Sequence, residues 1–222
     1  MIEIVLDVSA NTFKNDVNYF KRMVDEIKKI DSKEYKITFK TQLFEPTSKA
    51  AEVNECLLHD TFIEMHRYCN QSGYQLTSSV FDLYSLKFLL EFNIPFVKIA
   101  CRPETYFLLG FIPRKIHVYI STDCRKNCSD FPYYGNEHLL ECIPEYPASE
   151  EDYLKHSFQK GRWELNISDH TPGMYLFKKF VDYKKMEEGT YIFEMHYVLE
   201  RDAKNPDAGL FAKTIDELRG ML

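Results

Sequence analysis

Two histidines in the last quarter of the chain are the residues whose type and spacing could bind a metal. His170 follows residues 163–168, an alternating polar and apolar run that is typical of a strand, and His196 lies in a second strand-like run, residues 190–199. A helical pattern at residues 174–188 separates the two runs, which predicts a βαβ unit with parallel strands. Both histidines would then lie at the carboxyl edge of a sheet, where α/β enzymes place their chemistry.

Two interpretations of these histidines stay open on the residues alone. A single histidine at a strand end is more often a hydrogen-bonded core or rim residue than a metal ligand. Here each histidine has a carboxylate close by in the sequence, Asp169 for His170 and Glu194 for His196. Because ligand histidines usually need an orienting group of this kind, a divalent metal site is the alternative to a purely structural pair.

The composition restricts the class of protein. The chain has 222 residues, of which 45% are hydrophobic, and this is enough for one sizeable core, so we expect a single domain over residues 1–222. Its net charge of −6 and the lack of a basic cluster argue against nucleic acid as a partner. No apolar run reaches the roughly 18 residues that a membrane helix requires, so no membrane partner is expected.

The six cysteines raise the question of disulfides or zinc. The chain is too large and apolar to need disulfides, and its first residues do not resemble a signal peptide, so we expect six free thiols and a cytoplasmic location. Cys124 and Cys128 are separated by three residues, but no second Cys or His pair at zinc-ribbon spacing accompanies them. This spacing argues against a structural zinc.

Strand-like and helix-like patterns alternate along the chain. Eight strands are expected, at residues 1–8, 35–44, 74–80, 95–101, 115–122, 137–146, 163–168 and 190–199. Helical patterns lie between most of them and at the end, at residues 17–27, 56–70, 82–90, 103–112, 149–161, 174–188 and 214–222. Eight such units in this length fit a compact (β/α)8 TIM barrel, with a doubly wound sheet as the alternative.

Polar residues at the ends of these strands would ring one mouth of the barrel: Asp7, Ser79, Lys98, Ser121, Ser168, His170, Glu194 and His196. Lysine is almost never fully buried without a partner, yet Lys98 lies in an otherwise apolar run. A snorkelling lysine at a strand end would explain it, but we favour a cation that binds an anionic ligand. Hydroxyls with a lysine suit phosphate and carboxylate groups, and two histidines suit a divalent metal.

Several motifs, in this order along the chain, resemble the signature of the sialic acid synthase (N-acetylneuraminate synthase) family. The most specific are Ser168-Asp169-His170-Thr171-Pro-Gly, Glu194-Met-His196-Tyr-Val-Leu-Glu-Arg201 and Asn205-Pro206-Asp207. They are accompanied by Phe81-Asp82 after Ser78-Ser79, Phe96-Val-Lys98-Ile-Ala and Ile120-Ser121-Thr122. The similarity runs from about Glu3 to Leu222 and so covers essentially the whole chain.

The resemblance implies a (β/α)8 barrel that condenses phosphoenolpyruvate with an N-acylated amino sugar aldehyde, giving a nonulosonic (2-keto) acid and phosphate. It implies that His170 and His196 hold a divalent metal, Mn²⁺ first, with Mg²⁺ or Co²⁺ as alternatives, which polarises the aldehyde. Lys98 and Glu194 are the expected catalytic residues. The expected substrate-binding residues are Asp7, Asn11, Lys40, Ser79, Lys98, Ser121, Ser168 and Asp207.

The sequence also departs from the family pattern. The lysine that members carry in the second strand corresponds to Thr38, with Lys40 one side-chain alternation away on the same face. Where the family has a serine followed by a glycine, this chain has Cys101 and Arg102. Asp123 replaces a glycine close to the expected phosphate, and Pro144 replaces a polar residue. Thr38 and Pro144 favour a second function class, a non-catalytic paralogue that binds a sugar or phosphate ligand or assembles with a full-length partner, whereas the two motif histidines favour the enzyme.

The resemblance covers the family's barrel domain. In the family a C-terminal antifreeze-like domain reaches into the site of the partner subunit, and we expect this chain to carry the barrel alone. The same resemblance implies a homodimer, with small-molecule substrates as the other partners.

Overall fold

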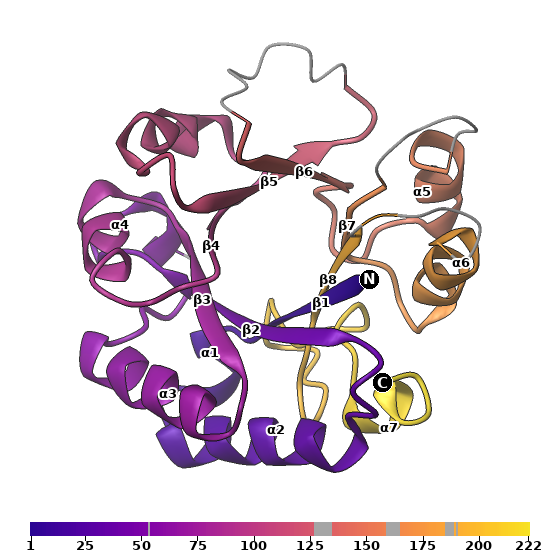
Figure 1. The fold of residues 1–222 in the computed structure, drawn as a ribbon, viewed down its shortest axis with the longest axis horizontal. Coiled ribbons are helices and arrows are strands. Elements are labelled where there is room, and N and C mark those ends of the chain that lie inside the picture. Colours follow the sequence, from indigo (N-terminus) through magenta and orange to yellow (C-terminus); the bar gives the residue numbers. More distant parts are fainter. Residues whose placement is uncertain (53, 127–134, 159–164, 185–188, 190) are drawn as a thin grey trace.

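Eight parallel strands close into a barrel in chain order, which confirms the predicted (β/α)8 architecture. The computed structural model describes residues 1–52, 54–126, 135–158, 165–184, 189 and 191–222. The strands are β1 (Ile2–Asp7), β2 (Lys36–Leu43), β3 (Gln75–Val80), β4 (Phe96–Ile99), β5 (His117–Asp123), β6 (Glu137–Cys142), β7 (Ile167–Asp169) and β8 (Tyr191–His196). Figure 1 shows this ring with helices around its outside.

The helices follow the sequence pattern with different bounds, and the short helix Ala10–Phe13 is one that the sequence did not predict. They are α1 (Ala10–Phe13), α2 (Val17–Ile30), α3 (His59–Gln71), α4 (Leu83–Leu89), α5 (Glu150–His156), α6 (Tyr175–Lys184) and α7 (Ile215–Leu218). Two 3-10 helices, η1 (Lys49–Glu52) and η2 (Pro103–Phe111), complete the set. No helix within the described ranges is both long and apolar enough to span a bilayer.

Three sequence predictions need correction or lie outside the described residues. The segment expected as an α-helix at residues 103–112 is the 3-10 helix η2. The expected loop at residues 45–55 contains η1. Trp163, Cys128 and the end of the helix expected at residues 174–188 are not among the described residues.

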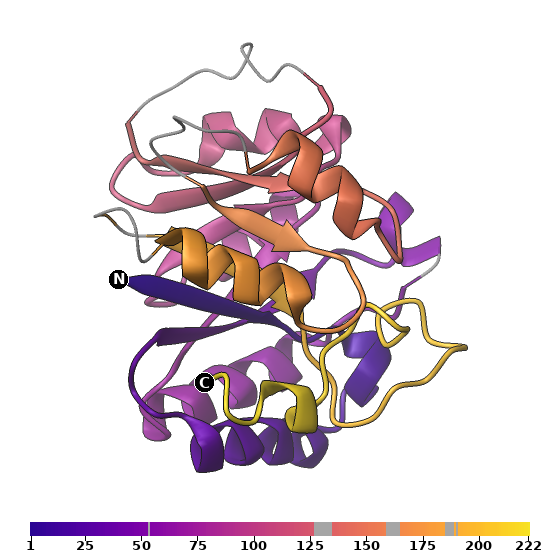
Figure 2. The ribbon, with the colours of Figure 1, turned by 90° about the vertical axis from the view of Figure 1, so that its right-hand side faces the viewer.

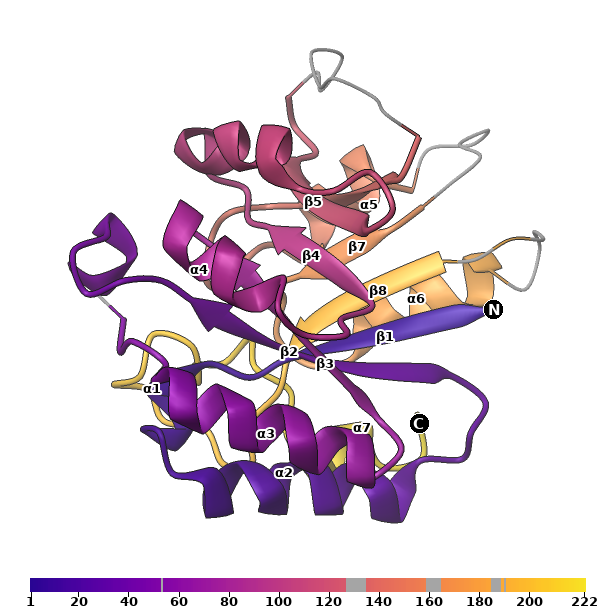
Figure 3. The ribbon, with the colours of Figure 1, turned by 60° about the vertical axis from the view of Figure 1, so that its left-hand side comes forward.

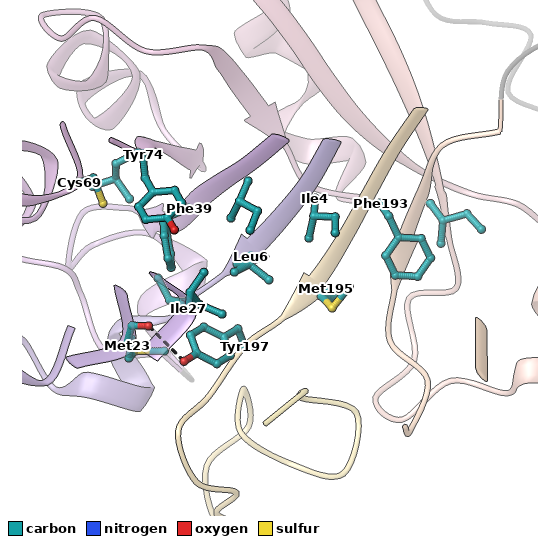
Figure 4. Packing of buried hydrophobic residues seen from close by; sticks show 14 of the residues in the cluster. Ile4, Leu6, Met23, Ile27, Phe39, Cys69, Tyr74, Phe193, Met195 and Tyr197 are labelled. Atoms are coloured by element: carbon teal, nitrogen blue, oxygen red, sulfur yellow. Dashed lines mark hydrogen bonds between the residues drawn. The ribbon is translucent and has the colours of Figure 1, made fainter. Parts of the chain in front are cut away.

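The outer face of the strands forms most of the core by packing against the helices. Helix α2 begins at its N-cap Asp16, whose side chain accepts a hydrogen bond from the Asn18 N–H, and it buries an apolar face against the barrel. Figure 4 shows part of this packing: Ile4 and Leu6 of β1, Met195 of β8, and Met23 and Ile27 of α2 belong to one buried cluster. The Tyr197 hydroxyl donates to the Met23 carbonyl at 3.2 Å, which ties the end of β8 to α2.

The inner face of the strands changes from apolar to polar along the barrel. Near the amino ends of the strands, the interior is filled by Val5, Phe96, Tyr119, Leu140 and Ile192. Side chains alternate between the two faces of a strand, so the residues two positions further along also point inward. These next residues include Asp7, Lys98, Ser121, Cys142 and Glu194, all buried. The barrel is therefore closed at one end and carries a polar interior at the other.

One segment after β8 covers part of the polar end. Figures 2 and 3 show the residues after His196 passing close to α1, at the end of the barrel to which the strand arrows point. Hydrogen bonds confirm this proximity, since Ser9 Oγ and Asn11 Nδ2 both donate to Asp207 Oδ2, each at 2.6 Å.

Candidate active site

A cavity of about 220 Å³ opens at the carboxyl ends of the strands, and every strand contributes to it. Of the residues predicted to bind substrate or metal, it is lined by Asp7, Lys40, Ser79, Lys98, Ser121, Ser168, His170, Glu194, His196 and Asp207. Asn11 is the exception, because it does not line the cavity but holds two residues that do. Its amide donates to Asp207 Oδ2 at 2.6 Å and to Asn54 Oδ1 at 2.8 Å.

Lys98 is a buried cation in a polar setting. Its ammonium donates to Ser121 Oγ at 2.6 Å and lies 3.6 Å from Glu194 Oε1, and its side chain is 2% exposed. Burial lowers the pKa of Lys98 because the low-dielectric interior penalises its charge, while Glu194 opposes that shift. Lys98 does not snorkel to solvent, and its charge is held inside the cavity.

Lys40 is the second buried cation, and it lies on the inner face as the alternation predicts. Its ammonium lies 2.7 Å from Asp7 Oδ2 and donates to Ser79 Oγ at 3.0 Å. Burial alone would lower the pKa of Lys40, but the carboxylates of Asp7 and Glu194 raise it above its usual value. Thr38 lies deeper, where its hydroxyl donates to Glu3 Oε1 at 2.8 Å near the closed end. Only Lys40 of these two lines the cavity.

Glu194 connects the two lysines to the seventh strand. Its Oε1 accepts a hydrogen bond from Ser168 Oγ at 2.9 Å. Burial would raise the pKa of Glu194, but Lys98 and Lys40 lower it to about 2, so the group is a carboxylate at neutral pH. Its Oε2 is buried and has no hydrogen-bond partner within the described residues.

The two predicted ligand histidines lie side by side at the mouth. Their ring centroids are 5.7 Å apart, and both rings line the cavity. His170 Nδ1 lies 2.8 Å from the Ile143 carbonyl, which fixes the proton on Nδ1 and leaves the lone pair on Nε2. Burial, together with His196, lowers the pKa of His170 to about 3, so this imidazole is neutral. A neutral, oriented imidazole is the form that binds metal.

Three buried side-chain atoms at the cavity lack a hydrogen-bond partner among the described residues. These atoms are His196 Nδ1, Asp7 Oδ1 and Glu194 Oε2. Within the same residues, no group of three or more His, Cys, Asp or Glu side chains has metal-binding geometry. A divalent metal at the mouth therefore stays a prediction, in which His170 and His196 would supply two ligands and substrate or water the other positions.

Sequence reasoning missed several residues at the site. Tyr146 lies between β6 and α5, and its ring centroid is 4.2 Å from that of His170. Phe211 is 4.9 Å from the His196 ring, and Gln42 and Asn54 line the cavity. The alternation of β2 could have identified Gln42, two residues after Lys40. Tyr146, Phe211 and Asn54 lie on loops, where no periodic pattern indicates direction.

The structure shows where the residues that depart from the family pattern lie. Arg125 binds the Asp123 carboxylate through Nε at 2.9 Å and Nη2 at 3.1 Å, so the acid near the expected phosphate is paired with a cation. Pro144 and Cys101 both line the cavity.

The described cysteines, Cys56, Cys69, Cys101, Cys124 and Cys142, are free thiols.

Comparisons with known proteins support the resemblance. The model of the NeuB family matches residues 19–123, from α2 to β5. An uncharacterized protein of Methanocaldococcus jannaschii is 25% identical over 227 residues, covering 89% of this chain and 62% of that protein. The chain therefore spans less than two thirds of the length of this relative.

Two solved structures share the fold. The N-acetylneuraminic acid (sialic acid) synthetase of Leptospira borgpetersenii superposes with a TM-score of 0.77 at 19% identity, over 98% of this chain and 80% of that one. A spore coat polysaccharide biosynthesis protein of Bacillus subtilis superposes with a TM-score of 0.69 at 16% identity, over 98% and 65%. With Lys40, Ser79, Lys98 and Ser121 inside the matched segment and the same barrel around them, this chain is NeuB-like, as the resemblance to the sialic acid synthase family predicted.

Proposed function

We propose that this protein condenses phosphoenolpyruvate with an N-acylated amino sugar aldehyde, releasing phosphate and forming a 2-keto acid. The observation that carries the proposal is the buried pair of lysines, Lys40 and Lys98, in a cavity whose mouth holds His170 and His196. Two buried ammonium groups suit a ligand with several negative charges, and two imidazoles suit a divalent metal.

Phosphoenolpyruvate would be bound by the lysines and the serine hydroxyls around them. Ser79 accepts a hydrogen bond from Lys40, and Ser121 accepts one from Lys98, so the lysines hold both hydroxyls in place. Each hydroxyl keeps its own proton for donation to a ligand oxygen. This arrangement offers charged and neutral donors together to the phosphate and the carboxylate.

The amino sugar would enter from the mouth, where the histidines and Asp207 lie. When bound by His170 and His196, a divalent metal such as Mn²⁺ supplies Lewis acidity to the aldehyde oxygen of the sugar. Asp207 is fixed by Ser9 and Asn11, and its other interactions would be with sugar hydroxyls. The fixed tautomer of His170 keeps Nε2 available at the mouth.

The reaction forms one carbon–carbon bond and breaks one carbon–oxygen bond. C3 of phosphoenolpyruvate attacks the aldehyde carbon, water adds to the positively charged C2, and phosphate leaves from C2 with the bridging oxygen. The protons of the water go to the former aldehyde oxygen and to phosphate. The ionised Glu194 stabilises positive charge that develops at C2, since a fixed carboxylate in a buried site acts strongly on such charge.

Release of phosphate tests this proposal. Phosphoenolpyruvate and Mn²⁺ are incubated with a panel of N-acyl mannosamines and related 6-deoxy sugars, and phosphate is measured over time. We expect release that needs both a sugar and the metal, that is lost in Lys98→Ala and that is kept in Lys87→Ala, an exposed lysine of α4. If phosphoenolpyruvate binds but no sugar gives release above Lys98→Ala, the protein is a non-catalytic ligand-binding relative instead.

A further inference from the structure

Four of the six charged side chains that line the cavity are paired with one another. Counting lysine, arginine, aspartate and glutamate, three cations and three carboxylates line it. Lys40 lies 2.7 Å from Asp7, and Lys98 lies 3.6 Å from Glu194, so these four charges neutralise one another. A phosphate ester carries about −1.5 to −2 at pH 7, and a carboxylate adds one more negative charge. An anionic substrate therefore needs positive charge that the protein has not already neutralised.

Arg102 is the remaining cation at the cavity. It lines the cavity four residues after Lys98, at the carboxyl end of β4, and it is half-buried. Its guanidinium lies over the Phe81 ring, 5.4 Å from the centroid, and no ion pair joins it to a carboxylate among the described residues. It is thus the cavity-lining cation in the described part of the chain that has no acidic partner.

The backbone of Arg102 is fixed while its side chain stays available. The Arg102 N–H donates to the Ala100 carbonyl at 2.7 Å. The Arg102 carbonyl accepts from the N–H of Thr105 at 2.9 Å and from its hydroxyl at 2.8 Å, which anchors the start of η2. A ring contact of this kind attracts a guanidinium more weakly than an ion pair with a carboxylate or phosphate does. A ligand anion can therefore draw it away.

We propose that Arg102 binds an anionic oxygen group, phosphate or carboxylate, of the substrate at the mouth of the cavity, an inference that rests on the proposed function. Its five N–H donors match two oxygens of either group, whereas a lysine offers only a point charge. Arg102 would be a substrate-binding residue next to Cys101, in addition to the lysines and serines that the sequence predicted.

The surroundings of Arg102 direct the anion inward. A second cavity, of about 310 Å³, shares Phe81 and Arg102 with the first and is lined by Glu45, Asp82 and Glu104. Those three carboxylates repel an anion, whereas two of the three carboxylates of the first cavity, Asp7 and Glu194, are paired with lysines. Arg102 lines both cavities, so its positive charge lies where an anion would pass into the first cavity.

Calorimetric titrations with three probes test the inference. Phosphoenolpyruvate, inorganic phosphate and pyruvate are titrated into the wild type, Arg102→Ala, Arg102→Lys and, as a matched control, Arg67→Ala, an exposed arginine of α3. We expect Arg102→Ala to weaken phosphoenolpyruvate binding roughly tenfold to a hundredfold, as loss of a charged hydrogen bond does. Arg102→Lys should restore part of the affinity, and Arg67→Ala should not change it.

The separate probes show which group of the ligand Arg102 contacts. They also distinguish a failure of this inference from a failure of the proposed function. Weaker binding of phosphate alone assigns the phosphate, and weaker binding of pyruvate alone assigns the carboxylate. If wild type binds phosphoenolpyruvate and Arg102→Ala, with an unchanged melting temperature, binds every probe equally well, the inference is wrong while the proposed function stands. If wild type binds phosphate but not phosphoenolpyruvate, the function fails, and Arg102→Ala against phosphate still decides the inference. Binding of no probe by wild type overturns both.

Discussion

The ammonium of Lys98 and the carboxylate of Glu194 lie 3.6 Å apart inside the barrel, and both side chains are almost fully buried. Each also bonds to a serine, Lys98 to Ser121 and Glu194 to Ser168. The four residues link β4, β5, β7 and β8 across the polar end of the barrel. The pair therefore contributes to the stability of the fold as well as to the proposed chemistry.

Removal of one partner of this pair should destabilise the protein. Lys98→Met leaves the Glu194 carboxylate buried beside fewer cations, and breaking a buried pair in this way typically costs about 3–5 kcal/mol. Lys98→Met with Glu194→Gln removes both charges and should recover most of that free energy of unfolding. Guanidinium unfolding curves of the two single variants and the double variant measure the effect. Losses that simply add in the double variant would show that the two groups do not interact.

The stability of the protein should also depend on the ionisation of Glu194. Its pKa is lowered from about 4.5 to about 2, so folding favours the carboxylate. The stabilisation from this group is then fully present above pH 4.5 and is lost as the pH falls from 4.5 toward 2. Thermal unfolding of wild type and Glu194→Gln between pH 2 and 7 tests this. The difference between them should shrink below pH 4.5, and a constant difference across this range would contradict the assignment.

Cys101 should be the most reactive described thiol near neutral pH. A hydrogen bond from Cys142 and the charge of Lys98 lower the pKa of Cys101 to about 7, although burial opposes them. The reactive species is the thiolate, so its alkylation by iodoacetamide should rise through pH 7 and level off above it. Peptide mapping should find Cys101 modified before Cys69, whose pKa burial raises. Because Cys101 lines the cavity, phosphoenolpyruvate should slow the reaction at Cys101 and leave that at Cys56 unchanged.

Binding of Mn²⁺ should require both histidines of the mouth. Calorimetry should lose the binding signal in His170→Ala and in His196→Ala, and keep it in His156→Ala, a histidine of α5 outside the cavity. Two imidazoles form a weak site alone, so the signal should strengthen when phosphoenolpyruvate is present. Equal binding by all three variants would return His170 and His196 to a structural role.

Binding of Mn²⁺ should also weaken in acid. His170 must be neutral to bind, and its low pKa keeps it neutral well below pH 6. If His170 limits binding, the affinity should fall only as the pH approaches 3. A fall at pH 6 to 7 would point to another group.

Much of the site could be predicted from the sequence because it lies on strands. Side chains point alternately to the two faces of a strand. If Lys98 points into the barrel, its neighbours Val97 and Ile99 must point outward, and the same alternation places Lys40, Ser121 and Glu194 inside. Parallel strands then bring their carboxyl ends to one edge, which collects residues that are far apart in the sequence. The histidines came together for this reason.

The parts that could not be predicted depend on loops and on pairing of charges. Nothing in the sequence indicates that Arg125 turns back onto Asp123, or that Tyr146 lies over His170. The buried pair of Lys213 with Asp169, 2.9 Å apart, joins a loop after β8 to the end of β7. Such contacts are set by tertiary packing, which periodicity does not report. The 3-10 form of η2 was missed for a related reason, since propensity decides weakly in short segments.

Lys40 should act as the second-strand lysine, and a lysine placed at Thr38 should not replace it. Thr38 lies two residues nearer the closed end, and its neighbour Glu3 also interacts with Tyr119 and Lys36. A lysine at position 38 would meet the Glu3 carboxylate and stay below the cavity. Lys40→Ala should therefore weaken phosphoenolpyruvate binding roughly tenfold to a hundredfold, and Lys40→Ala with Thr38→Lys should remain as weak.

Calorimetric titration and the phosphate-release assay measure both variants. Lys36→Ala is the matched control, because Lys36 lies on the same strand but pairs with Glu3 at 3.1 Å, away from the cavity. We expect this control to bind phosphoenolpyruvate as wild type does. If the double variant instead binds phosphoenolpyruvate as wild type does, a lysine at position 38 can replace Lys40, and this prediction is wrong.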